Sequence, residues 1–405
     1  MRLLIISQYF WPEDFRVNEL TSELVLRGHS VTVLTGLPNY PSGSLFPEFQ
    51  KDPELFAALD GAKIIRVSHI LRGNSTIQLL ANYISFFLSA SVCGPWLLRG
   101  CKFDGIFVFE TSPVTVGIVS SVMRAIKRAP VAFWVLDQWP ETLQAVGVTN
   151  NKFVLRMVGR LVAFIYRRCD AILAPARTLI PQLANYCEGS TKKIIYFPNW
   201  SDPISMEGVA PASEIGSVAG TFNVLFAGNI GVAQDFEAIL DAVEELKGDI
   251  RVRWLIVGDG RMSGWVRSEI DRRGLANSVQ MVGRVAQDRM PSFFVHADAL
   301  LVSLRPDPIF SMTVPGKLQT YLAAGKPVLA MLNGEGADVV RRANAGMVCD
   351  AGDSRGLARI VRSMMEIPKA QREQMGVNGR AYCAREFGKN VVVARLENIL
   401  MDLKR

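Results

Sequence analysis

Residues 1–36, MRLLIISQYFWPEDFRVNELTSELVLRGHSVTVLTG, decide the fold class. The run Arg2–Ile6 is short and almost entirely apolar, which is typical of a parallel strand buried on both faces. In Phe15–Arg27 apolar side chains recur at helical spacing, Gly28 ends that helix, and His29–Thr35 is a second strand. Strand, helix and strand with short connections form a β-α-β unit, so the stretch predicts a doubly wound parallel sheet.

The same alternation continues along the chain in two blocks. Further strands are predicted at AKIIRVS, FDGIFVFE, PVAFWVLD, CDAILAPA and KIIYFPN, and then at FNVLFAGNIG, RVRWLIVGDG, SVQMVGRV, ADALLVSL, KPVLAMLNG and GMVCDAGD. Between the blocks lies a segment rich in Pro, Gly, Ser and Ala. We predict a Rossmann-like domain at residues 1–200, a linker at 201–220, a second Rossmann-like domain at 221–385, and a C-terminal helix at 386–405 that can pack back on the first domain. The two domains are expected to face each other across a cleft.

Composition agrees with two domains and favours anionic ligands. The 405 residues exceed what one compact core usually holds, and 49% of them are hydrophobic, with a mean hydropathy of +0.19. The net charge of +7 predicts attraction to a phosphorylated substrate or an anionic membrane. Since the sequence has no Lys/Arg run and no aromatic RNA-binding signature, a nucleic-acid partner is not expected.

Other classes are disfavoured by what the sequence lacks. Six scattered cysteines without a CxxC pair predict reduced thiols in a cytosolic protein. The three histidines, His29, His69 and His296, are not paired at ligand spacing, so no metal site is predicted. The N-terminus turns polar and acidic too early for a secretory signal.

One uncharged stretch, Gly73–Leu98, is long enough to span a bilayer and is flanked by Arg72 and Arg99. A span inside an α/β domain would destroy that domain. Two interpretations remain open: a helix that lies in the membrane interface, and a helix packed in the core.

Ser311–Ala330, SMTVPGKLQTYLAAGKPVLA, holds two Gly-Lys pairs. It is not a P-loop, because neither Lys precedes Ser or Thr and no Gly stands five residues ahead of either pair. Neither domain has a G-x-G-x-x-G fingerprint after its first strand, and Gly258–Gly264 has the spacing G-x-G-x-x-x-G instead. A dinucleotide site is therefore not predicted.

Taken in order along the chain, the motifs resemble those of GT-B retaining glycosyltransferases of family 4. RGHSVTVLTG (Arg27–Gly36) is similar to the family's second-strand signature, and IIYFPNWSD (Ile194–Asp202) to its inter-domain segment. FAGNIGVAQDFEAILDA, LIVGDG, VGRV, ADALLVSL and YLAAGKPVLA resemble the successive donor-domain motifs. WPED, LPNYPSG, DQWPE and VPGK look most like enzymes that build O-antigen, colanic-acid and capsule repeat units.

The resemblance implies transfer of a sugar from a nucleotide-sugar with retention at the anomeric carbon, without a cofactor or metal ion. The donor, expected to be a UDP-sugar with an N-acetylated or deoxyamino sugar, binds the C-terminal domain. The acceptor, a polyprenyl-diphosphate-linked saccharide, binds the N-terminal domain. The protein is then expected in the cytoplasm, in peripheral contact with the anionic inner face of the cell membrane.

For the donor, the departing diphosphate needs cations or helix N-termini. Pro315 and Gly316 begin a short helix with Lys317 in its first turn, where the helix dipole disfavours a cation unless an anion is bound. Lys317 is the predicted diphosphate contact. Thr320 occupies the position of the family's usual ribose-binding Glu, and Glu335 is a candidate replacement. The other donor candidates are Gly228, Asn229, Gly231, Gln234, Gly258, Arg261, Arg284 and Arg305.

For the acceptor, Asp137 in DQWPE follows a strand end and is the candidate that orients the attacking hydroxyl. Glu110 in FVFETSP is the second catalytic candidate on the same argument. Glu13, Arg16 and Asn39, in the first and second strand-to-helix connections, are acceptor-binding candidates.

Two other functions stay open. A UDP-sugar 2-epimerase has the same architecture but needs dedicated acid and base groups, which three poorly placed histidines do not supply. A non-catalytic regulator that binds sugar nucleotides is the alternative suggested by the missing charges at Asn229, Gln234 and Thr320.

Overall fold

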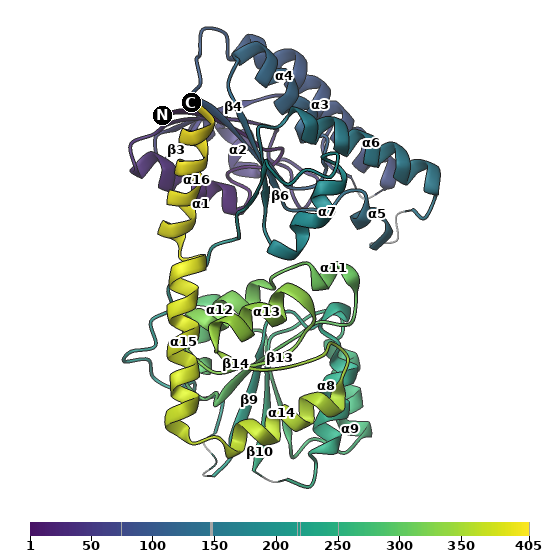
Figure 1. Ribbon diagram of the computed structural model, residues 1–405, viewed down its shortest axis with the longest axis vertical. Helices are drawn as coiled ribbons and strands as arrows, with labels where there is room; N and C mark the ends of the chain where they lie inside the picture. The colour runs from purple at the N-terminus through teal and green to yellow at the C-terminus, as the bar shows by residue number, and fades with distance from the viewer. Residues whose placement is uncertain (74, 146–148, 217, 219, 250, 405) are drawn as a thin grey trace. The chain divides into compact units, whose positions relative to one another are not determined.

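The computed structural model in Figure 1 describes residues 1–405 except 74, 146–148, 217, 219, 250 and 405. By internal contacts the chain divides into unit 1 (Met1–Pro175, Leu179–Phe197 and Val393–Arg405) and unit 2 (Ala176–Thr178 and Pro198–Val392). The predicted linker 201–220 and the uncharged stretch 73–98 contain residues 217, 219 and 74, which lie outside the described residues.

The sheet of unit 1 is built around β1 (Arg2–Ile6), whose residues after Arg2 are all buried. The strand order is β3-β4-β2-β1-β5-β6-β7-β8, and each neighbouring pair is parallel except β3 with β4. The short antiparallel strand β3 was not predicted from the sequence. The other bounds are β2 (Ser30–Thr35), β3 (Ala58–Leu59), β4 (Ala62–Arg66), β5 (Gly105–Glu110), β6 (Val131–Val135), β7 (Ala171–Ala174) and β8 (Ile194–Tyr196).

The sheet of unit 2 has the order β11-β10-β9-β12-β13-β14, and all its pairs are parallel. In both units the order runs outward from the first strand in one direction and then reverses, which is the doubly wound arrangement. The predicted α/β fold is thus confirmed in each unit. The bounds are β9 (Phe222–Ala227), β10 (Val252–Val257), β11 (Val279–Gly283), β12 (Ala299–Ser303), β13 (Val328–Met331) and β14 (Gly346–Cys349).

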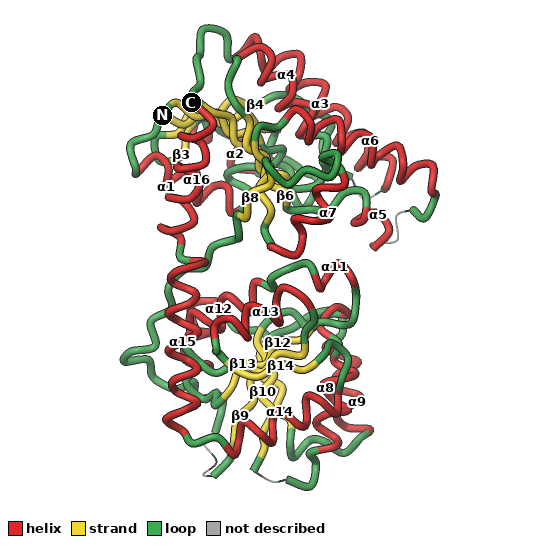
Figure 2. Tube along the Cα trace, in the orientation of Figure 1, coloured by secondary structure: helices red, strands yellow, loops and turns green. Residues whose placement is uncertain are grey.

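Helices cover both faces of each sheet, and the sheets lie between them in Figure 2. Unit 1 holds α1 (Arg16–Leu26), α2 (Pro47–Lys51), α3 (Thr76–Leu97), α4 (Val116–Lys127), α5 (Glu141–Ala145), α6 (Lys152–Arg168) and α7 (Ile180–Asn185). Unit 2 holds α8 (Phe236–Glu245), α9 (Ser263–Arg272), α10 (Met290–Phe294), α11 (Pro308–Ser311), α12 (Gly316–Ala324), α13 (Gly334–Ala343), α14 (Ser354–Glu366) and α15 (Lys369–Phe387). Single 3₁₀ turns lie at Pro53–Phe56, Arg177–Leu179, Val232–Gln234 and Gln287–Arg289.

Unit 2 has one apolar core on each side of its sheet. Side chains of α10, α12, α13 and α15 fill the core on one side, and those of α8, α9 and α14 fill the core on the other. The central strands β9, β10, β12 and β13 bury residues on both faces, which explains why these strands are nearly continuous apolar runs in the sequence.

The last helix, α16 (Lys389–Lys404), belongs to unit 1 from Val393 onward. Its Leu396 and Leu400 are fully buried. The Glu397 carboxylate accepts hydrogen bonds from Arg27 Nη1 at 2.9 Å and pairs with His29 Nε2 at 2.6 Å. Apolar burial and these ionic contacts together join the chain's end to the beginning of unit 1.

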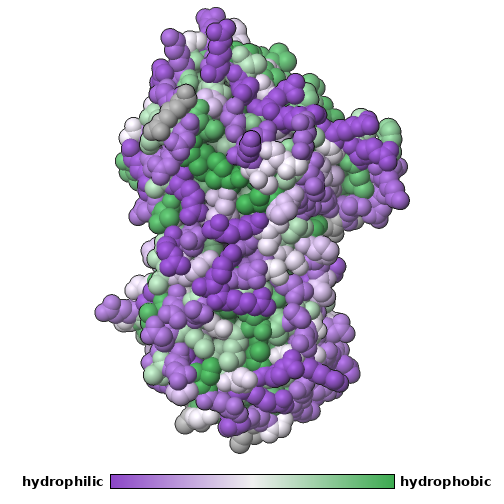
Figure 3. Space-filling model, in the orientation of Figure 1, coloured by the Kyte–Doolittle hydropathy of each residue, from purple (hydrophilic) through white to green (hydrophobic). Residues whose placement is uncertain are grey.

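Helix α3 contains most of the uncharged stretch. Its buried residues recur four apart, so one narrow stripe faces unit 1: Asn82, Phe86, Ala90 and Gly94. Elsewhere its apolar side chains are exposed, with Ile77 at 80%, Val92 at 73% and Trp96 at 66%. By length and composition α3 could cross a membrane, and 22% of its most apolar window is buried. The interpretation of α3 as a helix packed in the core is therefore wrong for most of the helix surface. Figure 3 shows apolar surface (green) on the side of unit 1 where α3 and α4 lie in Figure 1.

Candidate active site

A pocket of about 450 Å³ opens at the carboxyl ends of β9, β10 and β11 in unit 2. The strand order reverses between β9 and β12, and ligands of such sheets bind beyond the strand ends at this reversal. The pocket is lined by Gly228, Asn229, Val257, Gly258, Asp259, Gly260, Arg284, Val285 and Met290.

Two glycines let the loops after β9 and β10 approach each other. Gly228 has φ +124° and Gly258 has φ +140°, a region that side chains rarely adopt. A Cβ on Gly258 would lie 2.0 Å from the Gly228 carbonyl oxygen, so no larger residue fits. The pocket is consequently walled by backbone, and a ligand can come close to main-chain N–H groups.

Lys317 lies beside this pocket, in the first turn of α12 as predicted. Its Nζ donates to the Asn229 carbonyl oxygen at 3.1 Å and lies 3.8 Å from the centre of the Phe226 ring. Within the part of the chain that the structure describes, no carboxylate pairs with it. Burial lowers the pKa of Lys317 to about 7. A partly buried cation without a counter-ion, at a helix N-terminus, is suited to a phosphate.

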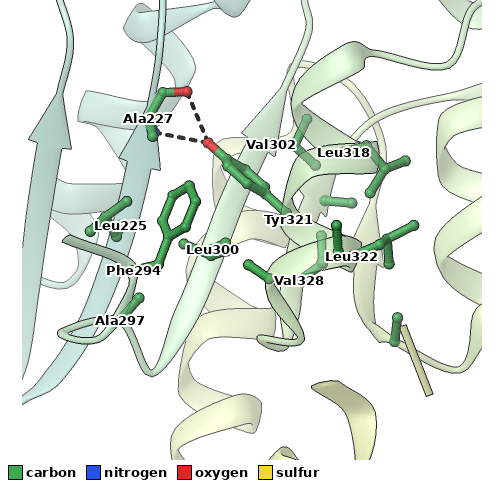
Figure 4. Close-up of a cluster of buried hydrophobic side chains, with 14 of the residues drawn as sticks. Leu225, Ala227, Phe294, Ala297, Leu300, Val302, Leu318, Tyr321, Leu322 and Val328 are labelled. Atoms are coloured by element: carbon green, nitrogen blue, oxygen red, sulfur yellow. Dashed lines mark hydrogen bonds between the residues drawn. The ribbon is translucent and has the colours of Figure 1, made fainter. Parts of the chain in front are cut away.

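The position of α12 is set by Tyr321, one turn further along the helix. Its hydroxyl donates to the Ala227 carbonyl oxygen at 3.0 Å and accepts from the Ala227 N–H at 2.8 Å (Figure 4). The ring packs among Phe294, Leu318 and Val302 in the core. Because Ala227 ends β9, this anchor holds the first turn of α12 against the loop Gly228–Asn229.

Five predicted donor residues thus come together. Gly228, Asn229, Gly258 and Arg284 line the pocket, and Lys317 contacts Asn229. The others do not line it. The Gln234 side chain accepts from the Gly231 N–H at 3.0 Å, and the Thr320 hydroxyl donates to the Gly316 carbonyl oxygen at 3.2 Å. Pro315 is the N-cap residue of α12, and Arg261 and Arg305 are exposed outside the lining.

Glu335, the candidate replacement for the ribose-binding Glu, is 1% exposed. Its carboxylate accepts from the Thr178 N–H at 2.8 Å and from Arg342 Nη2 at 2.5 Å. These internal partners occupy both oxygens. A donor contact at Glu335 stays a prediction, and it would require one of these bonds to be exchanged.

Some pocket residues were missed by the sequence analysis: Val257, Asp259, Gly260, Val285 and Met290. All but Met290 stand next to predicted residues in the motifs GDG and GRV. Strand-end position was the available signal, and in the motifs GDG and GRV it was applied to a glycine and two arginines alone.

In unit 1, the acceptor candidates lie along the carboxyl edge of the sheet. Glu110 ends β5, and Asp137 follows β6 on the adjacent strand. The Asp137 carboxylate accepts from the Ser112 N–H at 3.1 Å and from the Ser112 hydroxyl at 2.5 Å. Asp137 is partly exposed and Glu110 is buried, so the two candidates differ in their access to a ligand.

Glu13 is buried and joins two loops by hydrogen bonds. Its carboxylate accepts from the N–H groups of Phe10, Asn39 and Tyr40, at 2.9, 2.8 and 2.7 Å. Burial raises the pKa of Glu13 to about 7, against those N–H donors and the charge of Arg66. Asn39 is also buried, and Arg16 begins α1 with an exposed side chain. Acceptor contacts of Glu13, Arg16 and Asn39 stay predictions.

No metal-binding group is evident: among the described residues, no three His, Cys, Asp or Glu side chains are close enough together to hold an ion.

The part of the chain that forms the pocket is similar to a known protein family. The sequence model of the family described as "Glycosyl transferases group 1" matches residues 221–366. Unit 2 contains a group 1 glycosyltransferase domain. Every pocket residue, Lys317 and Tyr321 fall within this glycosyltransferase domain.

Two curated relatives are similar to the chain over more residues than the family model matches. The chain is 27% identical over 246 residues to the probable glycosyltransferase WbjE of Pseudomonas aeruginosa, which covers 58% of this chain and 60% of WbjE. It is 23% identical over 343 residues to the putative colanic acid biosynthesis glycosyl transferase WcaI of Escherichia coli (strain K12), covering 80% and 82%. The predicted resemblance to glycosyltransferases of O-antigen and colanic-acid type is confirmed.

Solved structures confirm the GT-B fold. Anabaena Alr3699/HepE in complex with UDP superposes with a TM-score of 0.69 at 16% identity, covering 99% of this chain and 100% of HepE. Each unit of the chain therefore has the Rossmann-like architecture predicted from its strands.

Proposed function

We propose that the chain transfers a sugar from a UDP-sugar to a lipid-linked saccharide acceptor, with retention and without a metal ion, in surface-polysaccharide synthesis. The observation that carries this proposal is Lys317, an un-neutralised cation at the N-terminus of α12 beside the pocket of a group 1 glycosyltransferase domain. The name of WcaI supports the polysaccharide assignment, that of WbjE supports glycosyl transfer, and the UDP bound to HepE supports the nucleotide.

The donor is proposed to bind with its nucleoside over Gly258 and Arg284 and its diphosphate against Lys317. As the bond from the sugar to the diphosphate breaks, negative charge grows on the departing oxygen. We propose that Lys317, the first N–H groups of α12 and the backbone of Gly228–Asn229 stabilise this charge in place of a metal ion; the contact of Lys317 with Asn229 supports this.

The acceptor is proposed to bind unit 1 with its attacking hydroxyl near Asp137. The Ser112 hydrogen bonds hold one oxygen of that carboxylate, so its orientation is set before the acceptor arrives. In retaining transfer through a single site, the donor phosphate can accept the proton of the hydroxyl. Asp137 then orients the hydroxyl and strengthens it as a nucleophile without itself carrying the sugar.

A lipid-linked acceptor requires contact with a membrane, and we assign it to the outer surface of α3 and α6. These two helices are linked through α4, which contacts both. The exposed apolar residues are Ile77, Leu80, Ile84, Leu88, Val92, Trp96 and Leu97 on α3, and Phe153, Val154, Met157 and Phe164 on α6. Exposed cations of α6 accompany them: Lys152, Arg156, Arg160, Arg167 and Arg168. Apolar side chains bordered by arginine suit an anionic interface on the cytoplasmic side.

Replacing Leu88 and Val92 with glutamate is expected to weaken binding to vesicles containing phosphatidylglycerol by at least about tenfold, because each change brings a charge into the apolar interface. Vesicle co-sedimentation measures it, and neutral phosphatidylcholine vesicles should bind the wild type less. V377E is the matched control, since Val377 is 59% exposed on α15 of unit 2. If L88E/V92E binds like V377E, the membrane surface is elsewhere.

The proposed reaction is tested by incubating the protein with bacterial membranes and a panel of radiolabelled nucleotide-sugars. Label in the lipid fraction with one UDP-sugar is the expected result. Release of a free epimeric sugar would indicate the epimerase instead. Tight nucleotide binding without any product across the panel would favour the non-catalytic regulator.

A further inference from the structure

The Glu110 carboxyl group lies inside the protein, out of contact with solvent. It is 0% exposed, at the last position of β5. Its Oε2 accepts the N–H groups of Leu136 and Asp137, at 2.9 and 3.0 Å. Its Oε1 has no hydrogen-bond partner among the described residues. Both bonded N–H groups begin the loop that carries Asp137.

Burial, together with the charge of Asp137, favours the protonated form of Glu110. The titratable groups that bear on it are the Asp137 carboxylate, on the loop after β6, and the buried Tyr166 hydroxyl of α6. Burial, and then the charge of Asp137, raise the pKa of Glu110 well above its ordinary value. Since Oε2 accepts two N–H groups, the proton belongs on Oε1. Two ionised carboxylates this close would also repel each other.

We propose, on the basis of the function proposed above, that Glu110 is a positioning residue: by holding the backbone of Leu136 and Asp137, it aims the Asp137 carboxylate at the acceptor. It is then neither the catalytic acid nor the catalytic base. The catalytic role expected of Glu110 from its strand-end position is thus replaced by a positioning role. Asp137 also follows a strand end, but it is partly exposed and can reach a ligand.

Glutamine is the deciding substitution, because it keeps an acceptor oxygen for both N–H groups and a donor in place of the acid O–H. E110Q is expected to transfer sugar within about threefold of the wild type, with an unchanged pH–rate profile. E110A leaves both N–H groups without an acceptor and should lose at least about 30-fold in kcat, with nucleotide affinity unchanged, since the donor pocket lies in unit 2.

A double-substitution cycle separates positioning from general destabilisation. If Glu110 acts through Asp137, E110A should cost less than about threefold in a D137N background. A merely structural Glu110 would lower activity by a similar factor in both backgrounds. The assays are run below the melting temperature of each variant.

The proposal is overturned if E110Q is as inactive as D137N or does not fold, because a neutral acid and glutamine make the same bonds. It is also overturned if E110A is as active as the wild type. Failure of the proposed function looks different, because the wild type itself would then transfer no sugar.

Discussion

Replacing Lys317 with methionine is expected to weaken binding of UDP by about 30- to 300-fold, the value of a charge-assisted contact to phosphate in a partly desolvated site. The fold should be as stable as the wild type or more so, because the wild type holds a cation against Gly228 and Phe226 with no carboxylate partner among the described residues. Calorimetric titration with UDP measures the first effect and thermal unfolding the second.

Lys326 is the matched control, since it is the lysine of the second Gly-Lys pair. Its Nζ donates to the carbonyl oxygens of Val295 and Ala297, at 3.3 and 2.8 Å, and so connects two loops. K326M should lower the melting temperature by several degrees, as for a loss of about 1–2 kcal/mol, and leave UDP affinity unchanged. If K317M binds UDP as the wild type does, Lys317 is not the diphosphate contact.

The same lysine makes UDP binding pH-dependent. Burial lowers its pKa to about 7 in the free protein, and a bound diphosphate must raise it. Binding then takes up a proton, so affinity should fall by up to tenfold per pH unit above pH 7. In the free protein the unfolded chain holds more protons between pH 7 and the ordinary lysine pKa, so the stability contribution of Lys317 rises with pH there. K317M should abolish both dependences.

Replacing Asp137 with asparagine is expected to slow sugar transfer by about 10²- to 10³-fold while UDP affinity stays unchanged. Ser112 donates two hydrogen bonds to one oxygen of Asp137, so an asparagine keeps its carbonyl oxygen there and presents an NH₂ group to the acceptor. The attacking hydroxyl then meets a donor in place of an anionic acceptor. Initial rates with membranes as acceptor source give the comparison.

Glu141, in the same DQWPE segment, supplies the control for Asp137. Its carboxylate accepts from the Tyr186 hydroxyl at 2.7 Å, and a glutamine can still accept that bond. E141Q should therefore keep its transfer rate. If D137N matches E141Q, Asp137 is not part of the acceptor site, and Asn39 and Arg16 become the next residues to test.

Much of the architecture could be predicted, because strands buried on both faces leave a clear apolar pattern in the sequence. The strands beginning at Arg2, Gly105 and Val131 are examples. The edge strand β3 was missed since it has two residues and no apolar run. The start of α12 could also be predicted, because Pro and Gly have positional preferences at helix ends, and Lys317 is placed accordingly.

The roles of individual acidic groups could not be predicted in this way. Glu13 stands in a loop, Glu110 at a strand end and Glu335 in the first turn of a helix, and such positions commonly hold site residues. Each is buried and bonded to backbone N–H groups in the structure. Those N–H donors belong to residues up to 157 positions away, so no local pattern announces them.

The sequence by itself determined two Rossmann-like units and a cation at the start of a helix, because burial and helix capping act over a few neighbouring residues. Only the tertiary structure decided that this cation meets a pocket. Tyr321 and Ala227, 94 positions apart, bind each other, and Gly258 closes on Gly228. Such contacts depend on how distant segments pack, and packing is a property of the whole fold.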